Sequence, residues 1–419
     1  MNETSVVITG LGFVSSIGCD EETVVDSLRR GRHGFSKVDL RKGVDLPIKV
    51  AGTVPGYDFP SPDVRDWVLP PESHVDLHRE PSLPPHGVYA VDAVEQAIAQ
   101  AGLTPDQLGD GATGLFGASA GSPMLLRHHL SAYDEGGSQR GHPLGVVRSI
   151  AGTLNFNLAA RYGIRGASCG YVSACASSSH ALGAACDEIA LGRQDRMIVV
   201  GAEECTAESI LPFDAMRALS TNADPDKVCR PFDQARDGFV VGAGAVAMVL
   251  ERASLVKQAP LAQILGWGQA ADGYHVASPH PDGLGIATAM KRALRSAEVD
   301  VAAVDYVNAH ATSTAAGDRA EAVALRSVFG AARPAVVSTK GLTGHGLSVA
   351  GVLEAALTVL SLNRGFIPGN RNLTHPDEAC EGLCLPTESM DAEVKLALNN
   401  SSGFGGANVC HVLAQPSFH

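Results

Sequence analysis

The residue with the clearest chemical potential is Cys175, in Val172-Ser-Ala-Cys-Ala-Ser-Ser-Ser-His180. A short extended segment ends there, and an alanine-rich helix is predicted over residues 176–191. The first N–H groups of a helix have no intrahelical partner and carry partial positive charge, so a thiolate at that end is favoured over a thiol. We therefore expect Cys175 to act as a nucleophile, although most free cysteines are simply small buried hydrophobic residues.

Two histidines are placed to work with such a thiol. His310 follows a strand predicted over residues 304–308, and His345 precedes a helix predicted over residues 347–362. The ends of strands are where α/β proteins hold ligands. With 15 histidines in the chain, either residue alone would be a surface or core side chain. Together with Cys175 they suggest a catalytic site.

A glycine-rich turn forms the third part of this set. It reads Asn400-Ser-Ser-Gly-Phe-Gly-Gly-Ala-Asn408 and precedes the last predicted strand. Such a turn can bring backbone N–H groups up to an oxyanion. By itself it is also compatible with an ordinary hairpin.

The elements that must position these residues alternate along the chain, which predicts parallel strands covered by helices. Several strands are almost entirely apolar, as in a sheet buried on both faces. Residues 44–85 are rich in proline and are predicted to form a surface excursion. The predicted strands are 6–11, 113–116, 197–201, 245–250, 262–266, 304–308, 335–338 and 408–413, and the predicted helices are 86–100, 176–191, 285–296, 317–329 and 347–362.

The order of elements around Cys175 recurs around Lys340. In both places a short strand, a turn of small residues and a long apolar helix follow one another. This repetition predicts two similar halves, residues 1–250 with the nucleophile and residues 251–419 with the two histidines. The site would lie where the halves meet.

Composition limits the remaining possibilities. The chain has 419 residues, 45% of them hydrophobic, and a net charge of −13, which argues against nucleic acid as a partner. We expect no membrane span and no signal peptide, hence a cytoplasmic location, because long apolar runs and a basic N-terminal flank are missing. Nine cysteines without disulfide or zinc-ligand spacing predict reduced thiols and no metal site.

Four motifs together resemble the signatures of the β-ketoacyl-acyl carrier protein synthases, in order and spacing. They are Ser173-Ala-Cys-Ala, Asn308-Ala-His-Ala-Thr-Ser-Thr, Ser338-Thr-Lys-Gly-Leu-Thr-Gly-His and Gly403-Phe-Gly-Gly-Ala-Asn. The resemblance extends over most of the chain, through Phe213-Asp-Ala-Met-Arg-Ala-Leu-Ser-Thr and Arg230-Pro-Phe-Asp-Gln-Ala-Arg-Asp-Gly-Phe-Val. It implies an α/β thiolase fold, with two βαβαβαββ halves in five αβαβα layers.

The resemblance also implies an activity, an acyltransferase of class 2.3.1. Cys175 would accept an acyl chain, and His310 and His345 would bind a malonyl thioester as it loses CO2. The resulting carbanion would attack the acyl group on Cys175, giving a β-ketoacyl product in fatty-acid elongation or a related polyketide or polyene pathway. The expected partners are an acyl carrier protein, whose phosphopantetheine carries the substrates, and a second copy of the chain, or a related subunit in a heterodimer. No other cofactor is expected.

The family pattern assigns supporting roles to three further residues. Lys340 and Glu321 match a pair in which the lysine keeps His345 neutral and the carboxylate holds the lysine. Phe404 would move as a gate when an acyl chain enters, and its backbone N–H, with that of Cys175, would form the oxyanion hole.

The chain departs from the family in three places. Ala311 replaces a glycine, and Ser402 replaces an aromatic residue of the gate. Near residues 78–86, where the family docks its acidic carrier with a basic helix, the chain reads Arg79-Glu-Pro-Ser-Leu-Pro-Pro. Docking is therefore expected to be less basic, with a dedicated carrier protein. A substitute patch could come from Arg65, Arg127, Arg140 and Arg148.

Two other functions fit parts of the pattern. A thiolase-like coenzyme A acyltransferase would need a second reactive cysteine beside the C-terminal turn, and Cys410 lies beyond that turn. A non-catalytic chain-length subunit would lack the nucleophile, which this chain retains.

Overall fold

The computed structural model describes residues 5–41 and 43–418. In these residues the main sheet has ten strands, and two short pairs lie outside it, β2 (Phe35–Lys37) with β3 (Val50–Gly52) and β11 (Phe366–Ile367) with β12 (Met390–Asp391). The strands of the main sheet are β1 (Val6–Ser15), β4 (Thr113–Ala118), β5 (Ser168–Tyr171), β6 (Arg196–Glu203), β7 (Gly244–Arg252), β8 (Ala262–Ala271), β9 (Tyr306–Asn308), β10 (Ala335–Val337), β13 (Leu396–Gly403) and β14 (Ala407–Ala414).

The strand order of the sheet repeats. The order is β10-β9-β13-β14-β8 on one side and β5-β4-β6-β7-β1 on the other, with the same parallel and antiparallel relations in each set. Only residues 6–8 of β1 pair with residues 262–264 of β8 to join the two sets. The internal repeat expected from the sequence is therefore present, although the boundary expected at residue 250 lies inside β7.

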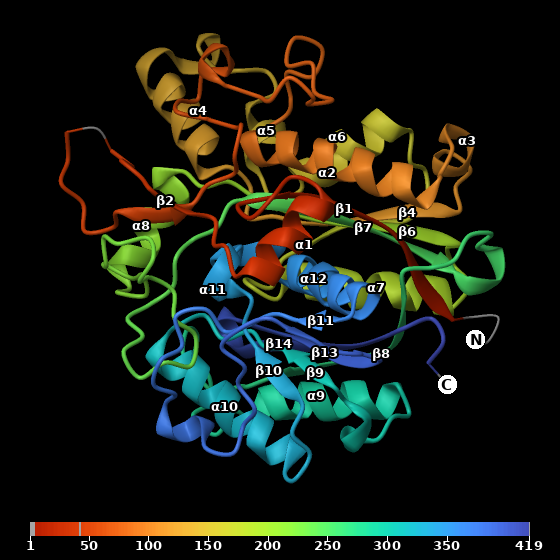
Figure 1. Ribbon diagram of the computed structural model, residues 1–419. Helices are drawn as coiled ribbons and strands as arrows, with labels where there is room; N and C mark the ends of the chain where they lie inside the picture. Colours follow the sequence, from red (N-terminus) through yellow and green to blue (C-terminus); the bar gives the residue numbers. More distant parts are fainter. Residues whose placement is uncertain (1–4, 42, 419) are drawn as a thin grey trace.

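The helices arrange these strands in five layers (Figure 1). Helices α7 and α12 lie between the two halves of the sheet, α2 and α6 cover one outer face, and α9 and α10 cover the other. The α-helices are α1 (Glu21–Arg30), α2 (Pro85–Ala101), α3 (Pro105–Leu108), α4 (Pro123–Gly136), α5 (Gly145–Ser149), α6 (Thr153–Tyr162), α7 (Ser177–Ala190), α8 (Ala207–Ala215), α9 (Leu284–Ser296), α10 (Ala315–Phe329), α11 (Lys340–Thr343) and α12 (Ala350–Arg364). The thiolase-type α/β fold expected from the resemblance is confirmed.

Burial explains the apolar sequence of the central elements. Every residue of β1, β4 and β6 is buried, as the runs of apolar residues predicted. Helix α12 is buried along most of its length. The segment Leu347–Arg364 is long and apolar enough to cross a membrane, but 89% of it is buried inside the protein, where it forms a core helix.

Helices α7 and α12 approach closely because Gly351 has no side chain. A Cβ at this position would lie 2.1 Å from Ser179 Oγ and 2.7 Å from Ser179 N. Next to it, the N–H of Val352 donates to Ser178 Oγ at 3.0 Å. The hydroxyl of Ser179 in turn donates to Ser401 Oγ at 2.7 Å, which ties α7 to β13. The two central helices therefore hold a fixed spacing.

Candidate active site

Cys175 lies in the connection between β5 and α7, where the sequence placed it. Ala174 has a φ of 51°, a left-handed conformation that turns the chain sharply before the cysteine. The N–H of Ala176 then donates to Ser173 O at 3.1 Å, and α7 begins at Ser177. The thiol is 8% exposed, so it faces the interior at the start of the helix.

Burial changes the expected state of this thiol. It raises the pKa of Cys175 to about 12, although the Lys340 ammonium acts in the opposite direction. Burial therefore opposes the thiolate that the helix end favours. Instead, His345 Nε2 lies 2.9 Å from Cys175 Sγ and can accept the thiol proton. The sequence argument weighed the helix dipole but could not weigh burial.

The two histidines come together beside the thiol. The rings of His310 and His345 are nearly perpendicular, at 86°, with their centroids 5.3 Å apart. His345 is fixed through its backbone, whose N–H donates to Val240 O at 2.7 Å and whose carbonyl accepts from Gly242 N at 3.0 Å. Phe239 packs edge-on against its ring at 5.2 Å. Three side chains from distant parts of the sequence thus form one cluster.

The environment keeps both histidines neutral. Burial, reinforced by the Lys340 ammonium, lowers the pKa of His310 and the pKa of His345 well below the usual range of histidine. At His310, the neighbouring His345 lowers the pKa further. A neutral imidazole can donate one hydrogen bond and accept another. The rings are therefore suited to donate to an oxygen that becomes negative during a reaction.

The partner of Lys340 differs from the one expected. Lys340 Nζ contacts Glu354 Oε1, on α12, and both side chains are almost completely buried, at 0% and 1% exposure. Burial raises the pKa of Glu354, and the lysine opposes this shift. The expected pairing of Lys340 with Glu321 is wrong in this respect. Glu354 is the only acidic residue of α12, but nothing in the sequence places it beside Lys340.

Glu321 instead orients the backbone of the first histidine motif. Its two carboxylate oxygens accept from the N–H of His310 at 2.9 Å and from the N–H of Ala311 at 2.6 Å. Asn400 Nδ2 donates to the same carboxylate at 2.6 Å. Glu321 therefore fixes the loop that carries His310, and Asn400, which the sequence reading did not single out, links this loop to β13.

The glycine-rich turn is the connection between β13 and β14. Gly403 packs tightly against the nucleophile segment: a Cβ there would lie 2.6 Å from Ser173 O and 3.1 Å from Cys175 N. Phe404 is 37% exposed, with its ring centroid 6.3 Å from that of Phe213. The turn therefore brings the backbone of residues 403–404 beside Cys175 and leaves the aromatic ring at the surface of the site.

A cavity of about 560 Å³ opens onto the cluster. Cys175, His310 and His345 line it, together with Phe404 and Ser402. The Ser402 hydroxyl is buried and has no hydrogen-bond partner within residues 5–41 and 43–418, so a polar group occupies the position where the family has an aromatic ring. The cavity gives a substrate access to all three reactive side chains.

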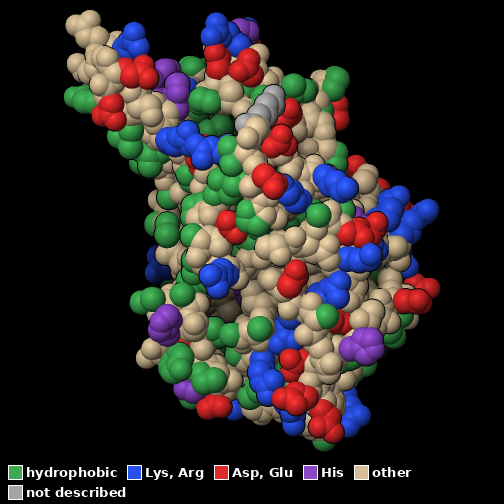
Figure 2. Space-filling view, turned by 90° about the vertical axis from the view of Figure 1, so that its left-hand side faces the viewer, with side chains coloured by type: hydrophobic (Ala, Val, Ile, Leu, Met, Phe, Trp, Pro, Cys, Tyr) green, Lys and Arg blue, Asp and Glu red, His purple; other side chains and the backbone are tan. Residues whose placement is uncertain are grey.

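The arginines considered for carrier docking are paired or buried. Arg65, Arg127 and Arg140 contact Asp63, Glu208 and Glu135. Arg148 is only 6% exposed. Basic and acidic side chains are interspersed over the face shown in Figure 2, without a broad basic area. Arg65, Arg127 and Arg140 are nevertheless exposed at the surface, so the substitute patch considered from the sequence stays a prediction.

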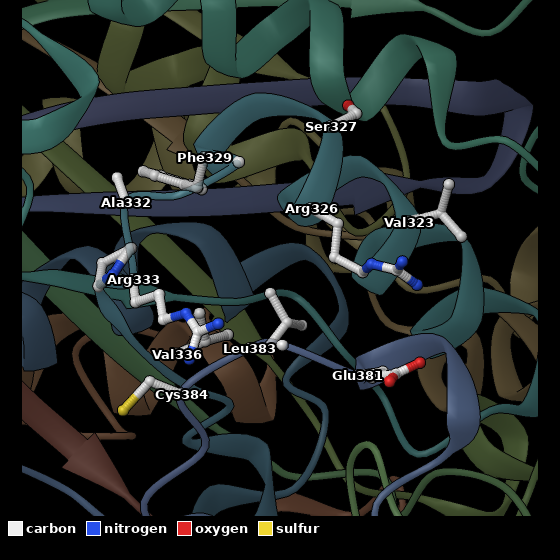
Figure 3. A pocket seen from close by; sticks show the side chains of 13 residues that line it. Val323, Arg326, Ser327, Phe329, Ala332, Arg333, Val336, Glu381, Leu383 and Cys384 are labelled. Carbon is white, nitrogen blue, oxygen red and sulfur yellow. The ribbon is translucent and has the colours of Figure 1, made fainter.

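A second cavity, of about 590 Å³, lies between the end of α10 and residues 381–384 (Figure 3). Arg326, Arg333 and the exposed Cys384 line it, over an apolar floor that includes Phe329 and Leu383. Among the described residues that line this cavity there is no histidine, so none of them offers its thiol the neighbouring base that Cys175 has. The chemistry described above is therefore confined to the first cavity.

Comparison with known proteins agrees with this site. Residues 3–255 match the family model "Beta-ketoacyl synthase, N-terminal domain", and residues 261–374 match the model of its C-terminal domain.

The 3-oxoacyl-[acyl-carrier-protein] synthase 1 of Haemophilus influenzae is 38% identical over 96% of this chain and 97% of its own. A β-ketoacyl synthase structure from Burkholderia phymatum superposes with a TM-score of 0.89 at 32% identity, covering 98% of this chain and 99% of that one. A type II PKS acyl-carrier protein in complex with its ketosynthase gives 0.87 at 25% identity, over 99% of this chain and 100% of the matched one. This chain belongs to the β-ketoacyl synthase family.

Proposed function

We infer that the protein catalyses decarboxylative condensation of an acyl group with malonyl-acyl carrier protein. The observation that carries this function is the cluster of Cys175, His310 and His345 on one cavity. Cys175 would attack an acyl thioester, forming acyl-Cys175 and releasing the carrier thiol. Its proton has His345 Nε2 as acceptor at 2.9 Å and would finally reside on that leaving thiol.

The histidines would then act on the second substrate. Loss of CO2 from a malonyl thioester places negative charge on the thioester oxygen, and two neutral imidazoles can donate hydrogen bonds to it. The carbanion attacks the carbonyl of acyl-Cys175, and the N–H groups of Cys175 and Phe404 would hold the tetrahedral oxyanion. Its collapse breaks the carbon–sulfur bond and releases the β-ketoacyl product. Removing one such donor typically costs roughly 10²–10³ in rate.

Fatty-acid elongation is the pathway that we favour over a polyketide or polyene pathway. The name of the Haemophilus influenzae relative and its full-length match support this choice. The complex of a related ketosynthase with an acyl-carrier protein supports carrier-bound substrates for this chain also. Because Arg65, Arg127 and Arg140 are each paired with a carboxylate, we propose a carrier whose docking depends less on charge than on apolar contacts. The site needs no cofactor beyond the phosphopantetheine of that carrier, and we place the enzyme in the cytoplasm.

A second copy of the chain is the partner that we propose for the far edge of the sheet. Strand β5 is the last strand, and residues 168–170 of it are exposed. An open edge strand offers unpaired N–H and C=O groups for pairing with another chain. Apolar side chains surround this edge, among them Val172 at 74% and Phe156 at 48% exposure. Mass spectrometry under native conditions would distinguish a homodimer from a heterodimer.

The two alternatives have weaker support. Cys410 lies within β14, completely buried and paired in register with Asn400, so it cannot serve as the second cysteine of a thiolase site. A non-catalytic chain-length subunit would not need a nucleophile, whereas this chain keeps Cys175, His310 and His345 in contact with one another.

The proposed function is tested in two steps. A cerulenin-like epoxide should add once to the intact protein, as measured by mass spectrometry, and the adduct should be missing in Cys175→Ala. In His310→Ala, malonyl decarboxylation should be lost while acylation of Cys175 stays measurable, whereas His345→Ala, which also removes the acceptor of the thiol proton, should slow both steps. Labelling at another residue would overturn the assignment of the nucleophile, and equal loss of both steps in His310→Ala would overturn the role of His310 in decarboxylation.

A further inference from the structure

The reactive cluster is also a set of metal ligands. Cys175, His310 and His345 each offer one donor atom, and these atoms all lie within 4.8 Å of one another. Sulfur and imidazole nitrogen are the donors that Zn²⁺ and chemically similar cations prefer. All three residues are buried, so bulk water has limited access to the donor atoms and competes less for a bound cation.

The distances are close to those of a zinc site. Zn–S and Zn–N bonds of about 2.3 and 2.0–2.1 Å in a tetrahedron place the donor atoms roughly 3.4–3.6 Å apart. The distance of 2.9 Å between Cys175 Sγ and His345 Nε2 is somewhat shorter than this. No two of the three donor atoms are more than 4.8 Å apart. Small rotations of the three side chains would bring them to equal distance from one ion. The cavity in front of them leaves the fourth coordination position open to water.

The surroundings of the histidines distinguish this cluster from a permanent metal centre. Histidines that hold a resident metal almost always donate their second ring N–H to a carboxylate, a carbonyl or water, and loss of that partner costs 10–100-fold in affinity. Among the residues that the structure describes, the buried Nδ1 atoms of His310 and His345 have no hydrogen-bond partner. A nearby cation, Lys340, further opposes a bound dication. Binding should therefore be reversible.

We propose that Cys175, His310 and His345 bind one Zn²⁺-like cation, which reversibly blocks the nucleophile. The S–H bond of Cys175 breaks, a sulfur–metal bond forms, and the proton goes to solvent, with no change of oxidation state. Metal binding rests on the geometry alone, whereas loss of condensation as its consequence rests on the proposed function.

Cobalt provides a readout that does not depend on activity. Co²⁺ added to the reduced, metal-free protein should bind at one ion per chain and give a thiolate-to-cobalt charge-transfer band with the visible bands of tetrahedral Co²⁺. Zn²⁺ should remove these bands by displacement, and a chelator should restore the metal-free spectrum. With Zn²⁺ present, alkylation of Cys175 by iodoacetamide should slow at least tenfold.

Matched variants make the result specific. Cys175→Ser and His310→Ala should lose the charge-transfer band, whereas Cys384→Ser, which removes an exposed thiol of the second cavity, should keep it. Wild-type protein alkylated at Cys175 beforehand should also lose the band, which avoids dependence on the folding of a variant. A band that survives this alkylation, or that is missing from the wild type, would overturn the metal site. A normal band without inhibition of condensation would instead refute the proposed function.

Discussion

Breaking the buried pair of Lys340 and Glu354 should destabilise the protein strongly. In Glu354→Gln the completely buried side chain of Lys340 loses the carboxylate that it contacts directly. Removing one partner of a buried ion pair typically costs about 3–5 kcal/mol, whereas replacing both partners by apolar groups of similar volume is often neutral. We therefore expect Glu354→Gln to lose about 3–5 kcal/mol of unfolding free energy, and Lys340→Met combined with Glu354→Gln to lose markedly less than the two single changes added together.

The assay is a double-mutant cycle in urea, with Glu321→Gln as the matched control. Glu321 is equally buried but hydrogen-bonds the N–H groups of His310 and Ala311. Lys340 acts on this carboxylate through space and without a hydrogen bond, so the coupling between Glu321→Gln and Lys340→Met should be clearly smaller than that between Glu354→Gln and Lys340→Met. If Lys340→Met rescues Glu321→Gln as well as it rescues Glu354→Gln, or rescues neither, the assignment of Glu354 as the counter-charge is refuted.

Three further changes test other parts of the site. Ser402→Phe fills cavity space beside Cys175, so acylation by long-chain thioesters should fall several-fold more than acylation by short-chain thioesters. Mass spectrometry of the acylated protein measures both, and equal losses would contradict a role of Ser402 in chain selection. Phe404→Ala removes the exposed ring but keeps its N–H, so acyl-Cys175 should hydrolyse faster, measured as released acid; an unchanged rate would argue against a gate. Burial raises the pKa of Glu203 from 4.5 to about 7, so the folded protein holds this proton more tightly than the unfolded chain. The protonated side chain of Glu203 therefore stabilises the folded protein, relative to the ionised one, by about 3 kcal/mol. This contribution is complete below about pH 4.5 and is lost as the pH rises to about 7. Glu203→Gln should flatten this part of the curve of unfolding free energy against pH, and identical curves for the variant and the wild type would refute the contribution.

The sequence predicted the parts of the fold that follow from local patterns. Eight strands of the main sheet and the long helices α2, α7, α9, α10 and α12 were expected close to their observed positions. Strand β13 was missed because Asn399, Asn400 and two serines interrupt its apolar pattern; the two asparagines donate hydrogen bonds to Gly351 O in α12 and to the carboxylate of Glu321. Helix α4 was missed because Leu126, Leu130 and Tyr133 are exposed, so its apolar residues do not lie on one face, and α8 was missed because Pro212 lies inside it.

For the site as well, local motifs could be predicted from the sequence, whereas contacts that depend on packing could not. Motif spacing was sufficient to select Cys175, His310 and His345, and their contact follows from the repeat of the fold. Which carboxylate meets Lys340 was not predictable, because Glu321 and Glu354 lie on different helices and only packing decides between them. The protonation of Cys175 was also beyond reach, since burial acts against the helix end and its extent is a property of the whole structure.

The close contact between α7 and α12 has a consequence for how such an enzyme can diversify. Cys175 immediately precedes α7 and His345 shortly precedes α12, so the spacing of these helices at Gly351 also sets the separation of sulfur and imidazole. The residues that shape the cavity, such as Ser402, lie outside this contact. Acyl preference can therefore drift through substitutions at the cavity wall without disturbing the reacting atoms, whereas any side chain at Gly351 should impair every substrate alike.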